Sequence, residues 1–327
     1  MPSACVRASV FKAVVFAYSE VGVRCLAALV EHGVQVPLVF THEDCITENA
    51  WFGSVAKLAA EHGIAVVKPG DANSPQWVRQ VAALAPDYIF SFYYRSLLAE
   101  PLLACPRWGA LNMHGSLLPK YRGRACVNWA ILNGESQTGA TLHYMVGKPD
   151  AGPIVAQEPV AIGIDDTALV VSQAVAKAAA RLLVRWLPTL AAGPPAGRAM
   201  NLSKGSYFGG RTPEDGRIDW SWPAARIHAL IRAVAPPFPG AFTDLGSQRL
   251  LFAHSNWCAE KSVYPELAPC LYVEDGRLYL DCSDGVRLKI AAFSVATEPV
   301  DAHAFGRLFG EAPLRFSTTA SKRKLHI

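Results

Sequence analysis

Residues 13–40 read AVVFAYSEVGVRCLAALVEHGVQVPLVF, and their pattern decides the fold class. The apolar run 13–18 has the length of a buried strand, and residues 23–31 repeat apolar side chains at helical spacing before Gly33, a helix stop signal. A second apolar run over 36–40 predicts the next strand. The same order continues with helices over 52–62 and 77–84 and with strands over 64–67 and 87–92. This alternation predicts an α/β fold with a mostly parallel sheet.

The second half of the chain has a different pattern. Residues 167–187 predict a long helix, which Asp165 and Asp166 precede as cap and dipole partners and which Pro188 and the Pro/Gly-rich run 191–197 end. After this linker come a short helix over 224–233 and short strands over 241–244, 249–253, 277–281 and 286–292, with a hairpin turn at Ser283-Asp284-Gly285. These predict a small, barrel-like β-domain. We expect an N-terminal extension over 1–12, a catalytic α/β domain over 13–200, a β-domain over 201–312 and a tail over 313–327.

Composition limits the function classes. A hydrophobic fraction of 51% with 18% charged residues is typical of a globular protein with a large core. The net charge of +4 is too small to indicate nucleic-acid binding, and the densest basic cluster is the terminal Lys322-Arg323-Lys324. The eight cysteines form no Cys-x-x-Cys pair, which favours free thiols in a reducing cytoplasm and no metal site. No apolar run reaches the length of a membrane span, and no signal peptide is recognisable, so we expect a cytoplasmic protein.

Residues 112–119, NMHGSLLP, carry the chemistry. They follow the apolar run 108–111, so they should lie where a buried strand breaks into a loop. Strand alternation places Asn112 and His114 on one face, and Leu111 and Met113 on the other. Open α/β sheets bind ligands at this carboxyl edge. An amide that stabilises a developing negative charge beside an imidazole that moves a proton indicates acyl transfer.

Two further segments add charge to this edge. Residues 120–124, KYRGR, place three cations where they can hold an anionic ligand, although a solvated loop would have the same composition. Asp150 lies in a Pro/Gly-rich turn, where an aspartate is commonly part of local turn chemistry. If the turn lies over His114, the Asp150 carboxylate raises the pKa of that histidine. His143 lies on a predicted strand near the site, and a structural role is simpler for it than a functional one. The chain has no G-x-G-x-x-G and no phosphate-binding P-loop, so we expect no NAD.

These motifs together resemble a known family. Asn112-x-His114, Ser116-Leu117-Leu118-Pro119, Arg122-Gly123 and Asp150 are similar to the signature of the folate-dependent formyltransferases. That family transfers a formyl group from 10-formyltetrahydrofolate to an amine. The resemblance implies a Rossmann-like catalytic domain followed by a small OB-like β-barrel domain.

A narrower resemblance is to the formyltransferase half of the bifunctional polymyxin-resistance enzymes. It rests on Phe90-Ser91-Phe92-Tyr93-Tyr94-Arg95, on residues 114–125 with Asn128-Trp129, on Ile231-Arg232-Ala233-Val234 and on Pro239-Gly240-Ala241-Phe242. It implies formylation of UDP-4-amino-4-deoxy-L-arabinose, a step in lipid A modification and antibiotic resistance. The decarboxylase activity of those enzymes, with its nicotinamide requirement, is then expected on another polypeptide.

The resemblance assigns roles residue by residue. It implies that His114 is the catalytic histidine, that Asn112 stabilises the transition state and that Asp150 raises the pKa of the histidine. It implies that the folate is lined by Ser96, Leu97, Leu98, Arg124, Val146, Gly147, Lys148 and Pro149. Tyr93, Arg211 and Arg232 are candidates for contact with the nucleotide sugar. The sequence departs from the narrower pattern at Cys126, where proline is expected, and at Cys45-Ile46, where Asn-Pro is expected.

Other functions remain open at this point. The acceptor can be another nucleotide-linked amino sugar. A methionyl-tRNA formyltransferase would need a basic C-terminal face, but residues 212–310 contain more acidic than basic residues. A formyl-folate hydrolase would let water attack at a similar site but typically carries an N-terminal regulatory domain, and a non-catalytic nucleotide-sugar binding protein would not need the three catalytic residues. We therefore expect a small-molecule nucleotide-sugar partner, no nucleic acid and no metal, and the sequence leaves the oligomeric state undefined.

Overall fold

The computed structural model describes residues 11–44 and 51–318. The expectations for residues 1–10, for Cys45-Ile46 and for the basic cluster of the tail lie outside the described residues. The chain divides into two compact units. The first comprises Met1–Cys126, Thr138–Val160 and Ser172–Tyr207, and the second comprises Val127–Gln137, Ala161–Val171 and Phe208–Ile327. Each unit has its own apolar core, so each is described separately.

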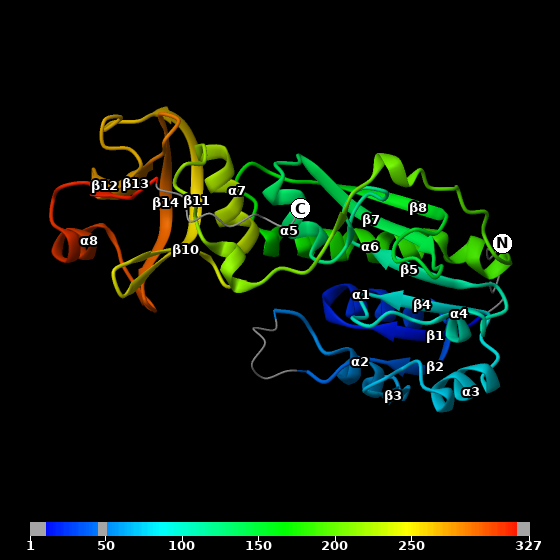
Figure 1. The fold of residues 1–327 in the computed structure, drawn as a ribbon. Coiled ribbons are helices and arrows are strands. Elements are labelled where there is room, and N and C mark those ends of the chain that lie inside the picture. The colour runs from blue at the N-terminus through cyan, green and yellow to red at the C-terminus, as the bar shows by residue number, and fades with distance from the viewer. Residues whose placement is uncertain (1–10, 45–50, 319–327) are drawn as a thin grey trace, which may run out of the picture. The chain divides into compact units, whose positions relative to one another are not determined.

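The first unit is built on a seven-stranded sheet with the order β3-β2-β1-β4-β5-β7-β8 (Figure 1). Its strands are β1 (Lys12–Ala17), β2 (Gln35–Phe40), β3 (Ala65–Val67), β4 (Tyr88–Phe92), β5 (Ala110–His114), β7 (Gln137–Tyr144) and β8 (Ile154–Ala161). The pairs from β3 to β5 are parallel, and β7 is antiparallel to β5. The mostly parallel sheet predicted from the sequence is confirmed.

Helices cover both faces of this sheet because its strands are apolar on both sides. They are α1 (Ser19–Glu31), α2 (Val55–Glu61), α3 (Pro75–Ala83), α4 (Glu100–Leu103) and α6 (Ala168–Ala192). One strand face, with Val15 and Phe90, packs against α1 and α6, and the opposite face, with Val14 and Ile89, packs against α3 and α4. The helices and strands predicted over residues 13–92 are confirmed, with ends that differ by a few residues.

The ends of α6 correct two expectations. The helix continues through Pro188 to Ala192. Proline removes only the hydrogen bond that its missing N–H would donate, and buried Leu187 and Leu190 on either side hold this last turn against the core. At the other end Thr167, and not the two preceding aspartates, accepts from the Val170 N–H at 3.5 Å.

The second unit contains an antiparallel sheet with the order β10-β11-β14-β13-β12-β16, with β15 paired to β14. Its elements are α5 (Cys126–Leu132), α7 (Ala224–Val234), β10 (Ala241–Leu245), β11 (Gln248–Lys261), β12 (Cys270–Glu274), β13 (Arg277–Asp281), β14 (Val286–Val295), β15 (Glu298–Pro299), α8 (Ala302–Phe309) and β16 (Leu314–Arg315). The sheet curls into half of a barrel, and α7 packs Ile227, Leu230 and Ile231 against its apolar face. This confirms the barrel-like β-domain, whereas β12 and α8 were not predicted.

The remaining elements are short. They are β6 (Arg122–Gly123), β9 (Tyr207–Phe208) and the 3₁₀ helices Leu202–Lys204 and Pro213–Gly216. Among the described residues, no helix combines the length and the apolar character needed to cross a membrane.

Candidate active site

The site is built at the carboxyl end of β5, and the register of the sheet determines its contents. Leu111 and Met113 point into the apolar core, and Asn112 and His114 point to the opposite face, as the alternation predicts. Because β7 is antiparallel to β5, Asn112 lies directly opposite His143 and His114 directly opposite Thr141. Side chains at opposed positions share one face of the sheet. The amide and two imidazoles of this strand pair are therefore neighbours.

Asp150 joins this group from the turn after β7. Its Oδ1 lies 3.3 Å from Nδ2 of Asn112, 3.5 Å from Nδ1 of His114 and 3.6 Å from Nε2 of His143. Its Oδ2 accepts from the backbone N–H of Gly123 at 2.9 Å. The structure thus brings together the three residues that the sequence singled out.

Backbone geometry fixes the Asp150 turn over the strand. Asp150 has a φ of +48°, a left-handed conformation that aspartate tolerates better than most residues. Two residues later, a Cβ on Gly152 would lie 2.0 Å from the carbonyl oxygen of Tyr144, so glycine is required there for the chain to pass this close to the end of β7. These two residues explain why the carboxylate reaches the β5 face.

Hydrogen bonds to carbonyl groups define the protonated nitrogen of each histidine. A carbonyl oxygen only accepts, so His114 donates from Nε2 to Tyr121 O at 2.8 Å and presents Nδ1 to Asp150. His143 donates from Nδ1 to Tyr144 O at 2.8 Å, so its Nε2 accepts from the Asn112 amide at 3.1 Å. His143 therefore fixes the direction of the amide. Sequence reasoning favoured a structural role for His143, and its position opposite Asn112 became visible only with the register.

Burial and charge act in opposite directions on the two ionisable groups. Burial alone would raise the pKa of Asp150, but the charge of His114, the nearby His143 imidazole and the Gly123 N–H together hold this pKa well below its usual range. Burial lowers the pKa of His114 from its ordinary value of 6.5, and the upward contributions of Asp150 and of the bond to Tyr121 do not reverse it. The contribution of Asp150 to the His114 pKa is upward, as expected, but burial outweighs it.

These directions predict the pH profile. His114 accepts a proton only when it is neutral, so we expect activity to fall with decreasing pH on a limb that lies below pH 6.5. Asp150 stays ionised across this limb because its own pKa is low. Asp150→Asn removes an upward contribution, so the limb should move to still lower pH while kcat decreases. Profiles of kcat/KM between about pH 5 and 8 for both enzymes test this. Titration of the acceptor amine affects the wild-type and Asp150→Asn profiles equally. An unchanged acid limb in the variant would therefore contradict the electrostatic coupling between Asp150 and His114.

The predicted folate-lining residues belong to two adjacent loops. Residues 96–98 follow β4, and the side chain of Asn73 holds this loop by donating to Leu97 O at 2.9 Å and accepting from Ala99 N at 2.7 Å. The other loop, 146–149, lies close to it because Leu98 and Met145 pack in one apolar cluster.

The side chains of these loops differ in exposure. Leu97 is 70% and Val146 44% exposed, so each of the two loops presents one large apolar side chain to solvent. Ser96, Gly147, Lys148 and Arg124 are exposed, Leu98 is buried and Pro149 is partly buried. The exposed members are accessible to a ligand, whereas Leu98 supports the loop from below.

Each of the three nucleotide-sugar candidates makes contacts within its own unit. The Tyr93 hydroxyl lies 3.9 Å from Sγ of Cys126. Arg211 lies 4.8 Å over the Trp129 ring and donates to Asp215 O at 2.9 Å. Arg232 is buried and donates to the carbonyls of Gly163 and Asp166 at 3.2 and 3.0 Å. Burial raises the pKa of Tyr93 well above its ordinary value, with smaller upward contributions from Cys126 and from the charge of Asp150, so Tyr93 lies within electrostatic range of the candidate site. Cys126 is the first residue of α5, where a proline is also tolerated, so the substitution leaves the start of this helix intact.

Gly115 directly follows the candidate base and leaves room for Tyr93. A Cβ at this position would lie 1.6 Å from the Tyr93 hydroxyl oxygen and 2.8 Å from its Cζ. We expect Gly115→Ala to destabilise the protein by about 1–3 kcal/mol because the tyrosine must move. Tyr93→Phe should restore part of this loss in the double variant. Chemical denaturation of the four proteins measures the coupling, and additive effects would contradict the proposed contact.

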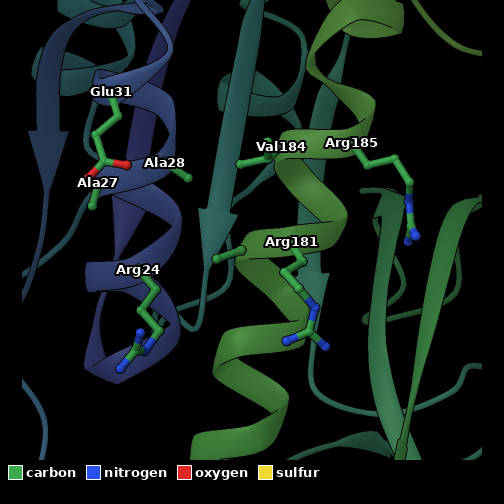
Figure 2. A pocket seen from close by; sticks show the side chains of 8 residues that line it. Arg24, Ala27, Ala28, Glu31, Arg181, Val184 and Arg185 are labelled. Atoms are coloured by element: carbon green, nitrogen blue, oxygen red, sulfur yellow. The ribbon is translucent and has the colours of Figure 1, made fainter.

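A groove elsewhere on the first unit does not include these residues. It has a volume of about 470 Å³ and lies between α1 and α6, lined by Arg24, Ala27, Ala28, Glu31, Ala180, Arg181, Val184 and Arg185 (Figure 2). Arg24 pairs with Glu20, and Arg181 and Arg185 both pair with Glu158. Its three cations are thus already ion-paired, and nothing in the groove resembles the chemistry at β5. Among the described residues, no group of three or more His, Cys, Asp or Glu side chains could hold a metal ion.

Comparison with known proteins identifies both halves of the chain. Residues 12–187 match the family model described as formyl transferase, and residues 211–307 match the formyl transferase C-terminal domain. An N-formyltransferase from Helicobacter canadensis, solved with folinic acid and dTDP-3-aminofucose, superposes with a TM-score of 0.68 at 19% identity, over 86% of this chain and 98% of that one.

Two other solved structures share the fold. WlaRD, a sugar 3N-formyl transferase solved with dTDP and 5-N-formyl-THF, gives 0.67 at 18% identity, over 88% and 98% of the two chains. Glycinamide ribonucleotide transformylase 1 from Symbiobacterium toebii gives 0.51 at 20% identity, over 59% and 95%. At these identities the structures establish a common fold, and the acceptor must be inferred separately.

Proposed function

Since this chain belongs to the formyl transferase family, we propose that it transfers the formyl group of 10-formyltetrahydrofolate to the amine of a nucleotide-linked amino sugar. The observation that carries the proposal is the convergence of Asn112, His114 and Asp150 at the carboxyl end of β5. An amide donor, a neutral imidazole and an ionised carboxylate are the groups that amide-forming acyl transfer requires. The exposed apolar side chains of Leu97 and Val146 supply a surface for the pterin ring beside them.

The proposed reaction follows from the tautomers. The free amine of the acceptor attacks the formyl carbon, and Asn112 stabilises the negative charge that develops on the formyl oxygen. Its N–H toward Asp150 forms only a long bond of 3.3 Å, which the formyl oxygen would replace. Nδ1 of His114 accepts the proton of the attacking amine, and the resulting imidazolium is paired with Asp150. The proton then passes to N10 of the folate as the carbon–N10 bond breaks, which regenerates neutral His114.

For the acceptor we propose UDP-4-amino-4-deoxy-L-arabinose. The support is the sequence resemblance in four separate stretches, two of which lie in the C-terminal half. The Helicobacter canadensis relative was solved with a dTDP-linked 3-amino sugar, so related folds accept other nucleotides and other amine positions. The sugar and its nucleotide are therefore the variables to test.

A panel of acceptors tests both the type of reaction and the identity of the acceptor. The purified enzyme is incubated with 10-formyltetrahydrofolate and with UDP- or dTDP-linked 3-amino or 4-amino sugars, and formylated product and free formate are both quantified. Amide product with the UDP-4-amino sugar is expected to form fastest. Faster product with a dTDP sugar would overturn the acceptor but keep the transferase. Formate release without any acceptor would indicate a hydrolase, and neither product would contradict enzymatic function.

A further inference from the structure

Arg122 carries a buried charge that the protein does not pair. Its side chain is only 8% exposed, and its Nε and Nη1 atoms are buried without a hydrogen-bond partner among the described residues. The guanidinium stays charged at any physiological pH. Burying an unpaired cation is strongly unfavourable, so such a group in a native structure indicates a ligand or another compensating function.

Other arginines with a buried unpaired nitrogen differ from Arg122. Arg211 leaves Nη1 unpaired but donates from Nη2 to a backbone carbonyl, and Arg232 leaves Nε unpaired but donates from Nη1 to two carbonyls. Arg24, the third such arginine, is ion-paired with Glu20, so all three are held by the protein itself. Among the described residues Arg122 makes no comparable bond, and the Tyr207 ring lies 5.9 Å from its Cζ.

The position of Arg122 connects it to the catalytic group. The residue before it, Tyr121, accepts the hydrogen bond of His114, and the residue after it, Gly123, donates to Asp150. Its own backbone N–H donates to Ser206 O at 3.0 Å, which fixes the loop against the segment that leads into Tyr207. The backbone of Arg122 therefore lies between the two residues that hold the base and the carboxylate.

We propose that Arg122 binds the diphosphate of the nucleotide-sugar acceptor, which rests on the proposed function. Nε and Nη2, the Nη atom on the same side, form a side-on fork that matches two oxygens of one phosphate group. In Arg122 the Nε half of this fork is unpaired, and so is Nη1 on the opposite side of the guanidinium. Tyr207, which is 55% exposed, presents an aromatic ring next to this fork, a combination suited to a nucleotide. A diphosphate held here places the attached sugar, and its amine, near Asn112 and His114.

The test compares Arg122→Met with Arg79→Met, the same substitution at an exposed arginine of α3. We expect Arg122→Met to raise the KM for the amino-sugar nucleotide at least tenfold and to change the KM for the formyl donor less than twofold. UDP, dTDP and inorganic pyrophosphate, added without formyl donor, should raise the melting temperature of the wild type and of Arg79→Met but not of Arg122→Met. Arg122→Lys, which keeps the charge without the fork, should show an intermediate rise in KM and covers the case in which the methionine variant fails to fold.

The outcomes separate this proposal from the proposed function. Normal stabilisation of Arg122→Met by UDP and pyrophosphate, or a rise confined to the KM for the folate, would overturn the role of Arg122 while leaving formyl transfer intact. A wild type that is stabilised by these ligands through Arg122 but formylates no amino sugar would retain the diphosphate site and reject the proposed function. A wild type that none of the three ligands stabilises would overturn the Arg122 proposal.

Discussion

His114→Ala is expected to lower kcat by about 10³-fold or more, because general acid–base catalysis by one residue commonly contributes 10²–10⁴-fold. The variant has no group to accept the amine proton at the position of Nδ1. The fold should tolerate the change, because the Tyr121 carbonyl that His114 contacts also accepts from the Ser116 hydroxyl at 3.3 Å. Steady-state kinetics and a thermal unfolding curve of the same preparation measure the two effects together.

Two controls make this expectation specific. His32→Ala removes an exposed histidine at the end of α1, whose Nδ1 contacts Ala28 O, and should leave kcat unchanged. Added imidazole should restore part of the activity of His114→Ala by entering the space that the side chain leaves. A His114→Ala enzyme with near-normal turnover would show that the proton moves without this residue, and the mechanism would have to be abandoned.

The fold was largely predictable from the sequence because local signals and tertiary packing agree over much of the chain. Apolar runs and glycine stops locate the strands and helices of residues 13–92. The same reasoning was wrong at Pro188, because burial of Leu187 and Leu190 outweighs the bond that proline lacks. Helix α8 was missed because it is only eight residues long and Gly306 interrupts its pattern.

The site was predictable to the extent that it depends on one strand. Alternation along β5 is a local property, and it is sufficient to place Asn112 and His114 on one face of the sheet. The position of His143 depends on the register with an antiparallel neighbour, which no single segment encodes. The motif indicates the Asp150 charge that raises the pKa of His114, whereas the degree of burial, which lowers this pKa, cannot be inferred from a motif.

Arg122 shows the same limit of prediction from the sequence, here in a loop whose charged side chains are expected at the surface. Three cations in five residues can hold an anionic ligand or form a solvated loop, and the structure buries Arg122 and exposes Lys120 and Arg124. Which side chain of a loop turns inward is decided by the segments that pack on it, here Ser206 and Tyr207. Composition therefore indicated an anion site, and only the fold selected one residue for it.

Asn112→Ala is expected to lower kcat and kcat/KM together by about 10²–10³-fold, the usual effect of removing one oxyanion donor. The two parameters should fall equally because the donor acts on a charge that exists only in the transition state. Stability should fall by about 1–3 kcal/mol, since Nε2 of His143 loses its amide partner at 3.1 Å. Initial rates at saturating and at low acceptor concentration separate kcat from kcat/KM.

Asn112→Asp tests whether the N–H group of Asn112 is what stabilises the oxyanion. Aspartate has nearly the shape of asparagine but, when ionised, only accepts hydrogen bonds. It would also place a second carboxylate against Oδ1 of Asp150, now 3.3 Å from the amide nitrogen, and like charges at this distance raise the pKa of one of the pair. The isosteric variant should therefore be at least as impaired as Asn112→Ala. If Asn112→Asp kept most of the wild-type kcat at neutral pH, the amide would only fill space between β5 and β7, and the oxyanion would have to be stabilised by another donor.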